Sequence, residues 1–420
     1  MNFGYACLAF GVQDAKIRTC RLQNASPKVL RIIIGQNLNA LENMIDYNIG
    51  NGITLYRISS DLIPFGSHVA NKLVWQDEYK EQLTRISGKI KAAGMRVSMH
   101  PGPYNVLNSL GPQVVQRTID DLNYHERVLT CLQTDAASKI VLHIGGIFGN
   151  KKEALKRFKT HFAYLDDAVK RRLVLENDER YFHIGDVLEI AQALGLPVVF
   201  DTLHHSVNNC RGYRTQNDWL WLCKQTWKEK DGKQKIHYSQ QDDAKRPGAH
   251  SQTVCIHEFL SFYNEITDKD IDVMLEVKDK NLSAVKCTLS ISNQHDIAKL
   301  ENEWSRYKYL VLEKSPSGYA AIRQLLNDKS DYPAAEFYDI IETSLAKPHN
   351  TGHAMNAAQH IWGYFKTVCT DKEKLEFARL TDRFLSGTVS FLSVKRFLYK
   401  LCASYNMTCL LHSYFFLNIV

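Results

Sequence analysis

Six histidine, glutamate and aspartate residues occur near the ends of six successive apolar runs. In chain order they are His100, His143, Glu176, Asp201, His237 and Glu276. Each run has the composition of a β-strand, and a stretch of helical periodicity separates it from the next. Imidazole and carboxylate groups together are ligands that divalent Zn or Mn take in proteins. The repetition therefore predicts a site that holds more than one divalent ion.

Two further imidazoles could join this site. His204 follows Asp201 by three residues, a spacing that lets both side chains face the same pocket in a turn. An Asp-x-x-His pair also occurs in ordinary helix caps, so its position directly after an apolar strand is what favours metal binding. His250 lies in the loop sequence PGAHS, where it serves either as a ligand or as part of the loop structure.

The carboxylates of Glu176 and Glu276 both follow strongly apolar residues and are expected to be buried. One interpretation is a buried carboxylate paired with a lysine, since Lys278 lies two residues beyond Glu276. Two buried carboxylates at one end of a sheet would however repel each other without a cation between them. We therefore expect divalent ions, with Glu176 bridging two of them.

Lys235 lies two residues before His237, so both side chains point to the same side of their strand. A positive charge at this position conflicts with a site that holds cations. We therefore expect Lys235 either to face a phosphate group or to be modified to a carbamate. Together with Glu176 and His237 it makes up the predicted catalytic set.

Eight β-rich runs alternate with helical stretches over about 300 residues. The runs are residues 3–10, 53–59, 95–100, 139–145, 173–178, 196–203, 234–239 and 271–277. Helices are expected at 77–93, 152–171 and 184–194. This alternation favours parallel strands and predicts an α/β protein built on a (β/α)8 TIM barrel, whose active face lies at the carboxyl ends of its strands.

The strand pattern ends near residue 300. We predict a barrel domain at 1–300, a linker at 301–332 and a helical C-terminal domain at 333–420. Three aromatic residues, Trp362, Tyr364 and Phe365, are expected to lie in the core of the helical domain.

Composition narrows the class of protein only in part. The net charge of +7 favours a polyanionic partner weakly. The ten scattered cysteines form no CxxC pair, and the N-terminus lacks the pattern of a secretory signal, so we expect a cytoplasmic protein. The apolar run CLLHSYFFLNIV is too short and too interrupted to span a bilayer, so no membrane partner is expected.

Two catalytic motifs of large enzyme classes are absent from the sequence. The chain has no GxSxG elbow and no P-loop, so the sequence does not support acyl transfer or nucleoside-triphosphate hydrolysis. A cluster of several metal ions in a barrel suits in-line hydrolysis of a phosphodiester instead.

Nine sequence strings resemble those of the UV damage endonucleases, in the same order over about 300 residues. They are GYAC at 4–7, NGITLYRISSDLIPFGSH at 51–68, SMHPGPYNVLNS at 98–109, LHIGG at 142–146, LENDE at 175–179, FDTLHH at 200–205, KIHYSQQ at 235–241, PGAHS at 247–251 and MLEVKDKNLSA at 274–284. The segments 356–366 and 380–391 resemble a bacterial helical domain of unknown function.

The resemblance implies a metal-loaded TIM barrel that cuts the DNA backbone immediately 5′ of ultraviolet photoproducts and some other lesions. It implies two or three divalent ions, Mn first and Zn or Mg as alternatives, and a carboxylated Lys235. The implied metal ligands are His100, His143, Glu176, Asp201, His204, His237, His250 and Glu276. The expected partner is double-stranded DNA containing lesions, bound by a monomer.

Residues expected to contact DNA come from the resemblance and from side chains suited to phosphate binding. They are Tyr5, Arg57, Ser59, His68, Pro103, Tyr104 and Asn105. Tyr104 matches an aromatic residue that probes the duplex at the lesion. The neighbouring probe position is usually Gln in the family, whereas this chain has Pro103, which offers no amide but can wedge into an opened stack. The departure leaves the lesion preference open.

Three other functions share part of the pattern. An abasic-site endonuclease of the endonuclease IV type would use the same metal chemistry without the HPGPY loop at 100–104. A sugar isomerase would also place carboxylates and histidines at barrel ends, but would not need the segment 51–68. A DNA-binding protein with structural metals would need closed coordination shells.

Overall fold

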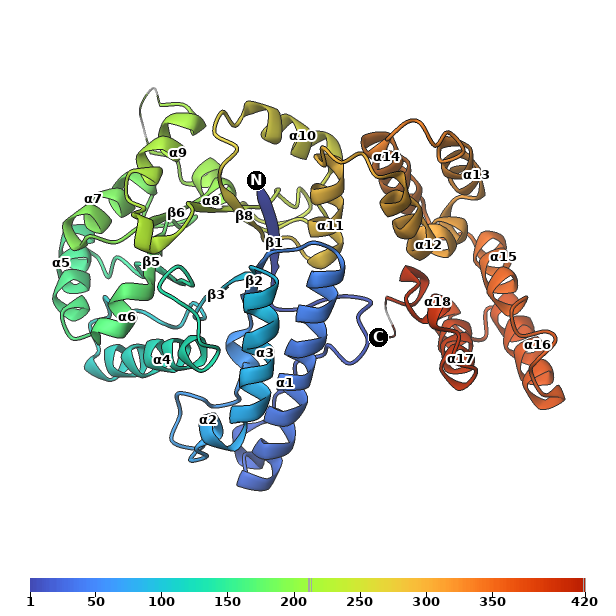
Figure 1. Cartoon of the computed structure of the whole chain (residues 1–420), viewed down its shortest axis with the longest axis horizontal. Helices are drawn as coiled ribbons and strands as arrows, with labels where there is room; N and C mark the ends of the chain where they lie inside the picture. The colour runs from blue at the N-terminus through green and yellow to red at the C-terminus, as the bar shows by residue number, and fades with distance from the viewer. Residues whose placement is uncertain (211, 213, 418, 420) are drawn as a thin grey trace. The chain divides into compact units, whose positions relative to one another are not determined.

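The protein contains a closed barrel of eight parallel strands in chain order (Figure 1). This computed structural model describes residues 1–210, 212, 214–417 and 419. The strands are β1 (Asn2–Ala6), β2 (Leu55–Ile58), β3 (Arg96–Met99), β4 (Ile140–His143), β5 (Leu173–Glu176), β6 (Val198–Asp201), β7 (Lys235–Tyr238) and β8 (Asp272–Leu275). The first strand pairs with both β2 and β8, which closes the barrel and confirms the predicted fold class.

Each strand is shorter than the run that predicted it. The run 3–10, for example, corresponds to β1, which covers Asn2–Ala6. The strands are apolar on both faces because parallel barrel strands are covered by helices outside and by packed side chains inside. Val141, Val174 and Val199 form one such buried cluster. Apolar residues beyond the paired positions lie in loops, which is why the periodicity overestimates the strand lengths.

Helices cover the outside of the barrel, as Figure 1 shows for α1, α3 and α4. They are α1 (Pro27–Gly50), α2 (Trp75–Glu78), α3 (Lys80–Ala92), α4 (Pro112–Cys131), α5 (Lys151–Phe162), α6 (Asp167–Arg172), α7 (Ile184–Leu194), α8 (Thr202–Val207), α9 (Gln216–Lys224), α10 (Ile256–Glu265) and α11 (Asn281–Ser290). The expected helix 184–194 matches α7, which ends at Gly195 with a left-handed φ of 68°. The expected helices 77–93 and 152–171 are each divided in two, at Tyr79 and after Phe162.

The chain divides into two compact units. The first comprises Met1–Ala9, Asp14–Val254 and Phe259–Val285, and the second comprises Phe10–Gln13, Cys255–Glu258 and Lys286–Val420. Further helices of the second unit are α12 (Ile297–Lys314), α13 (Pro316–Leu325), α14 (Ala334–Leu345), α15 (Thr351–Trp362), α16 (Asp371–Leu385), α17 (Phe391–Ser404) and α18 (Thr408–Leu411). Positions 418 and 420 of the predicted helical domain lie outside the described residues.

The expected linker at 301–332 is wrong, because most of it is helical and belongs to the core of the second unit. Tyr309 and Leu312 of α12 are buried in one apolar cluster with residues of α15 and α17. Charged residues on the exposed face of α12 made this segment resemble a linker in sequence. Trp362 and Phe365 are buried in the same cluster, whereas the ring of Tyr364 is partly exposed.

Among the described residues, no helix is both long enough and apolar enough to cross a membrane.

Candidate metal centre

The six residues that end successive strands come together at one rim of the barrel. His143, Glu176 and Asp201 are the last residues of β4, β5 and β6. His100 and Glu276 follow β3 and β8 directly, and His237 is the third residue of β7. Because all eight strands are parallel, their carboxyl ends lie at the same end of the barrel.

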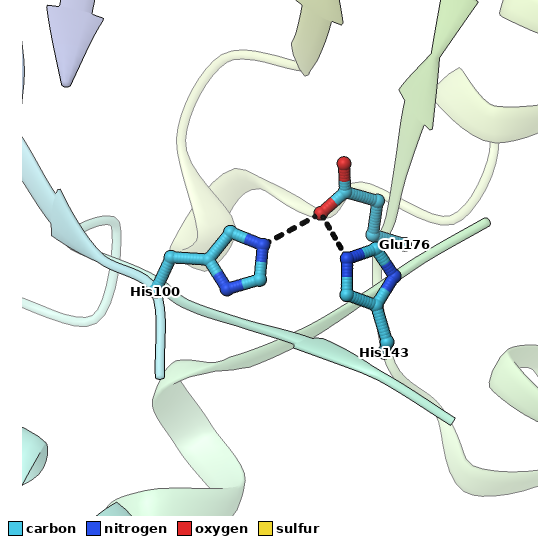
Figure 2. Close-up of side chains that lie close together, drawn as sticks. All are labelled: His100, His143 and Glu176. Atoms are coloured by element: carbon cyan, nitrogen blue, oxygen red, sulfur yellow. Dashed lines mark hydrogen bonds and ion pairs between the residues drawn. The ribbon is translucent and has the colours of Figure 1, made fainter. Parts of the chain in front are cut away.

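Glu176 lies at the centre of this arrangement and is almost fully buried. Its Oε2 is 3.0 Å from His100 Nε2 and 3.6 Å from His143 Nε2. Figure 2 marks both contacts with dashed lines. Its Oε1 is 2.7 Å from His237 Nδ1. One carboxylate therefore faces imidazoles from three different strand ends.

Three groups of side chains could each hold an ion, and Glu176 belongs to all of them. The groups are His100–His143–Glu176, Glu176–Asp201–His204 and Glu176–His237–Glu276, in each of which the ligand atoms lie within 4.8 Å of one another. A carboxylate shared in this way is suited to bridge neighbouring ions. The arrangement fits the prediction of more than one divalent ion.

Buried polar atoms without partners give an independent test of this fit. Asp201 Oδ2, His143 Nδ1 and His237 Nε2 are buried and accept or donate no hydrogen bond among the described residues. Leaving such atoms unpaired in a protein interior is costly. Nitrogen and oxygen donors of this kind are those that Mn and Zn take, so the residues present fit a divalent metal centre.

The electrostatics of the carboxylates favour cations. Burial alone would raise the pKa of Glu176, but His237 and His143 hold it well below the usual range. Burial likewise opposes ionisation of Glu276, and Arg57 and His237 lower its pKa. Burial raises the pKa of Asp201. The site thus concentrates carboxylates whose charge is balanced by neighbouring positive groups.

The pKa values of His100 and His204 are shifted in opposite directions. Burial lowers the pKa of His100 to about 4, so this imidazole is neutral and able to bind a metal. Burial also opposes the charge on His204, but Asp201 and Glu176 outweigh it and raise the pKa of His204 to about 9. In the absence of an ion, a proton on His204 therefore supplies part of the positive charge that the carboxylates require.

Glu276 is held by Arg57 and not by the lysine that follows it in sequence. The Arg57 guanidinium forms an ion pair with Glu276 Oε1, and both side chains are largely buried. This corrects the interpretation that Lys278 pairs with Glu276. Arg57 was expected to contact DNA, but its guanidinium is paired with Glu276 inside the site. His250 lies farther out, with Nδ1 3.9 Å from Glu276 Oε2.

Lys235 is fully buried in the barrel below His237. Its Nζ makes no hydrogen bond among the described residues, and burial holds its pKa well below the usual range. The nearest charges include Arg96 and Asp272, at the amino ends of β3 and β8. A side chain at this depth lies away from the rim, which does not favour a lysine that faces a phosphate group.

Some of the residues expected to contact DNA are exposed to solvent, and others are buried. His68, Pro103 and Tyr104 are exposed, and the ring of Tyr104 is 69% exposed. Tyr5 does not fit the expectation, because its ring is fully buried and its hydroxyl donates to Asn48 Oδ1 over 2.8 Å.

Two more of the expected DNA contacts are buried and have structural partners. Ser59 is buried, and its side chain caps the short helix Ser60–Leu62. Asn105 is also buried, and its side-chain amide donates to Asp121. Both can position the surface loops from within the protein.

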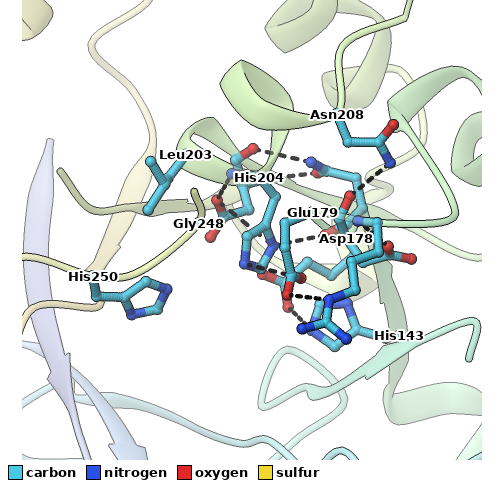
Figure 3. A network of polar contacts seen from close by, with 12 residues as sticks. His143, Asp178, Glu179, Leu203, His204, Asn208, Gly248 and His250 are labelled. Atoms are coloured by element: carbon cyan, nitrogen blue, oxygen red, sulfur yellow. Dashed lines mark hydrogen bonds and ion pairs between the residues drawn. The ribbon is translucent and has the colours of Figure 1, made fainter. Parts of the chain in front are cut away.

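Glu179 is a site residue that the sequence did not single out. Its Oε2 lies 4.0 Å from His204 Nε2, and Figure 3 shows both side chains in one polar network with His143. Its Oε1 is 3.5 Å from Arg246, which lies in the loop that carries His250. The spacing of three residues from Glu176 in LENDE was the available indication, since the intervening turn brings both carboxylates to the same rim.

Several known proteins are similar to this chain. It is 38% identical over 389 residues to the UV DNA damage endonuclease of Clostridium perfringens (strain 13 / Type A), with 91% of this chain and 92% of that protein covered. It is 29% identical over 314 residues to the UV DNA damage endonuclease of Bacillus mycoides (strain KBAB4), covering 72% and 98%. The crystal structure of SacUVDE superposes with a TM-score of 0.66 at 36% identity, covering 69% of this chain and 98% of that one.

Two family matches divide the chain much as the structure does. Residues 308–418 match a protein family of unknown function, DUF1722, which confirms the resemblance of the helical part. Residues 1–308 match the family described as UV-endonuclease UvdE, which confirms the resemblance of the barrel. With this match and the similarity to the clostridial protein, the chain belongs to the UV-endonuclease UvdE family.

Proposed function

We propose that this protein is a metal-dependent endonuclease that hydrolyses the DNA phosphodiester immediately 5′ of ultraviolet photoproducts and other lesions. The observation that carries the proposal is Glu176, a buried carboxylate shared by three candidate ligand groups at the active rim of the barrel. Membership of the UvdE family supports the choice of DNA as the substrate.

The ligands would be His100, His143, Glu176, Asp201, His204, His237, His250 and Glu276, and they suit two or three ions, with Mn as the best match to mixed nitrogen and oxygen donors. When bound, such ions lower the pKa of an attacking water and stabilise the leaving oxygen of a phosphodiester.

The chain's own residues orient this centre. The Oδ1 of Asp201 accepts a hydrogen bond of 2.7 Å from the backbone N–H of His204, which leaves Oδ2 to face the site. The His204 Nδ1 donates to the backbone oxygen of Asn177 over 3.0 Å, which directs its Nε2 outward. Arg57 fixes Glu276 through their ion pair. These contacts position the ligands before substrate binds.

Recognition of the lesion is assigned to the exposed loop that follows His100. Damage weakens base stacking and lowers the cost of deforming the duplex, so a protein can sense many lesions without a pocket for each. The ring of Tyr104 is exposed on this loop, close in sequence to the metal ligand. Stacking of a base on such a ring contributes roughly 1–3 kcal/mol.

The test uses supercoiled plasmid in three forms: untreated, irradiated with ultraviolet light, and partly depurinated. We expect the protein with Mn²⁺ to nick the irradiated plasmid and to leave the untreated plasmid intact, and we expect a chelator to abolish nicking. Mapping the cut should place it on the 5′ side of the photoproduct. Nicking confined to the depurinated plasmid would instead indicate an abasic-site endonuclease, and undiminished nicking with chelator would exclude metal-dependent hydrolysis.

A further inference from the structure

The segment 100–105 carries Tyr104 and is called the probe loop below. It is attached to the rest of the barrel domain at Asn105, its last residue. Asn105 is buried, and its Nδ2 donates to Asp121 Oδ2 over 2.8 Å and to the backbone oxygen of Gly102 over 3.1 Å. Asp121 is a buried residue of α4. The loop therefore begins at the metal ligand His100 and ends on a carboxylate of a long helix.

The same helix also holds the backbone of His100. His125 lies one turn after Asp121 on α4 and is fully buried. Its Nε2 is 2.8 Å from Ser60 Oγ, and this hydroxyl donates to the backbone oxygen of His100 over 3.0 Å. His100 is thus connected to α4 through Ser60 and His125, and the probe loop is connected to α4 through Asp121, one turn earlier.

The two attachments meet at Asp121. Residues four apart on a helix face the same side, and His125 Nδ1 lies 2.6 Å from the backbone oxygen of Asp121 and 3.6 Å from its Oδ2. The other carboxylate oxygen of Asp121 accepts a hydrogen bond of 2.8 Å from Ser67. The buried carboxylate of Asp121 therefore connects the probe loop to the loop of Ser67, and the backbone oxygen of the same residue accepts from His125.

Packing alone does not hold the probe loop in place. A cavity of about 450 Å³ is lined by Tyr104, Asp121 and Tyr124 together with the loop from Ser60 to His68. The Tyr104 ring borders this space and is largely exposed. The hydrogen bond between Asn105 and Asp121 therefore restrains the loop beside a ring that little of the protein covers.

We propose that Asp121 is a positioning residue, which holds the Tyr104 loop at a fixed place relative to His100. Insertion of the ring into a weakened base stack then brings the neighbouring phosphodiester to the metal centre. Asp121 contacts neither DNA nor an ion in this role and acts through Asn105 and Tyr104. The inference rests on the proposed function and adds to it a residue that couples recognition of damage to incision.

A double-mutant cycle with the full-length protein tests this role. Asp121→Asn keeps the shape of the side chain but removes the charge and one acceptor. We expect it to reduce the preference for a photoproduct-containing duplex over undamaged duplex on the order of tenfold, since hydrogen bonds to charged groups are the strong ones. Binding of undamaged duplex and Mn content should stay near wild type, while the melting temperature falls because a buried charged hydrogen bond is weakened. Asn105→Ala removes the donor of the same hydrogen bond and should reduce the preference to a similar extent.

The control is Asp120→Asn, which makes the same charge change at the adjacent exposed position of α4, where Asp120 accepts a hydrogen bond from Gln116 of the same helix. In a Tyr104→Ala background, Asp121→Asn should cause no further loss, because its effect passes through the ring. Additive losses in the double variant, or equal losses on damaged and undamaged duplex, would overturn the positioning role. A wild-type protein that shows no preference for irradiated DNA would overturn the proposed function itself.

Discussion

Glu176 is the residue that all three candidate ligand groups share. Burial works against its ionisation, and the surrounding imidazoles, His237 and His143 first, lower its pKa. Its two oxygens face different groups, with His100 and His143 on one side and His237 on the other. A neutral isostere would keep the shape but could not balance the charge of two neighbouring cations.

Glu176→Gln should therefore retain the fold and lose incision by more than about 100-fold, because replacing even supporting residues of a metal centre costs 10–100-fold. The measurement is nicking of irradiated plasmid, with circular dichroism as the check on folding and metal analysis on content. Incision at the wild-type rate would show that Glu176 does not hold the ions.

Lys235 leads to a prediction about modification. Its amine is buried without a hydrogen-bond partner among the described residues, two residues from His237 on the same strand. A carbamate would replace this amine with a negatively charged group that accepts hydrogen bonds. We expect the intact protein to show the mass of one added carbamate, and Lys235→Ala to lower incision about tenfold or more. An unmodified mass together with full activity of the variant would contradict this.

His204 makes metal binding depend on pH. Burial opposes its charge, but Asp201 and Glu176 raise its pKa to about 9, above the ordinary 6.5. The charged form stabilises the metal-free fold below about pH 6.5, and this contribution is lost as the pH rises through about 9. An ion can bind only after His204 loses its proton, so affinity should rise up to tenfold per pH unit between these values.

Calorimetry of Mn²⁺ binding at pH 7.5, in buffers of different ionisation enthalpy, should report the release of this proton. His100, whose pKa is lowered to about 4, is already neutral at this pH and should not contribute. His204→Asn should abolish that release. Binding without any proton release in the wild type would show that His204 is not protonated in the free protein.

At the scale of elements, the connection between β3 and α4 carries both recognition and chemistry. It begins with His100 and reaches the exposed Tyr104 four residues later. The strand fixes one end of this segment and the Asn105–Asp121 hydrogen bond fixes the other. A short segment restrained at both ends loses little conformational entropy when its ring stacks on a base.

Tyr104→Ala should weaken binding of photoproduct-containing duplex by roughly 5- to 150-fold, the equivalent of about 1–3 kcal/mol of stacking. Binding of undamaged duplex and metal content should change little. Tyr164→Ala is the matched control, since this exposed tyrosine follows the end of α5, at the opposite end of the barrel from the ligands. Equal losses on both duplexes would make Tyr104 a general contact to the backbone of DNA.

Pro103→Gln should shift the preference among lesions more than the maximal rate.

At the scale of the whole molecule, each of the two units has its own apolar core. The helical unit is built around aromatic residues such as Trp362 and Phe377, whose rings stack at 4.2 Å. All three candidate ligand groups found among the described residues lie in the barrel unit. Metal should therefore stabilise the barrel and leave the stability of the helical unit unchanged.

Differential scanning calorimetry checks this expectation. With free Mn²⁺ at 100 times its dissociation constant, the barrel should gain about 2.7 kcal/mol, which corresponds to a rise of roughly 5–10 °C in its melting temperature. Chelation should reverse the rise. Glu176→Gln should lose most of it, and a rise of the same size in that variant would place the stabilising ion elsewhere.

The sequence by itself determined the barrel and the residues that line its active rim. Strand runs and helix ends depend on local periodicity and on turn residues such as Gly195, so they can be recognised without knowing the partners of each strand. Ligands placed at successive strand ends must converge once the strands are parallel. The identities of His100, His143 and Glu176 therefore followed from position alone.

Only the tertiary structure decided how these side chains are paired. Arg57 neutralises Glu276 across 219 positions of sequence, and Asp121 reaches Asn105 from a different element. Tyr5 is buried against Asn48, although its motif suggested a DNA contact, and 301–332 packs as helices where its charges suggested a linker. The physical reason is that burial and charge pairing depend on barrel closure, which joins β1 to β8 and brings together residues that no local pattern relates.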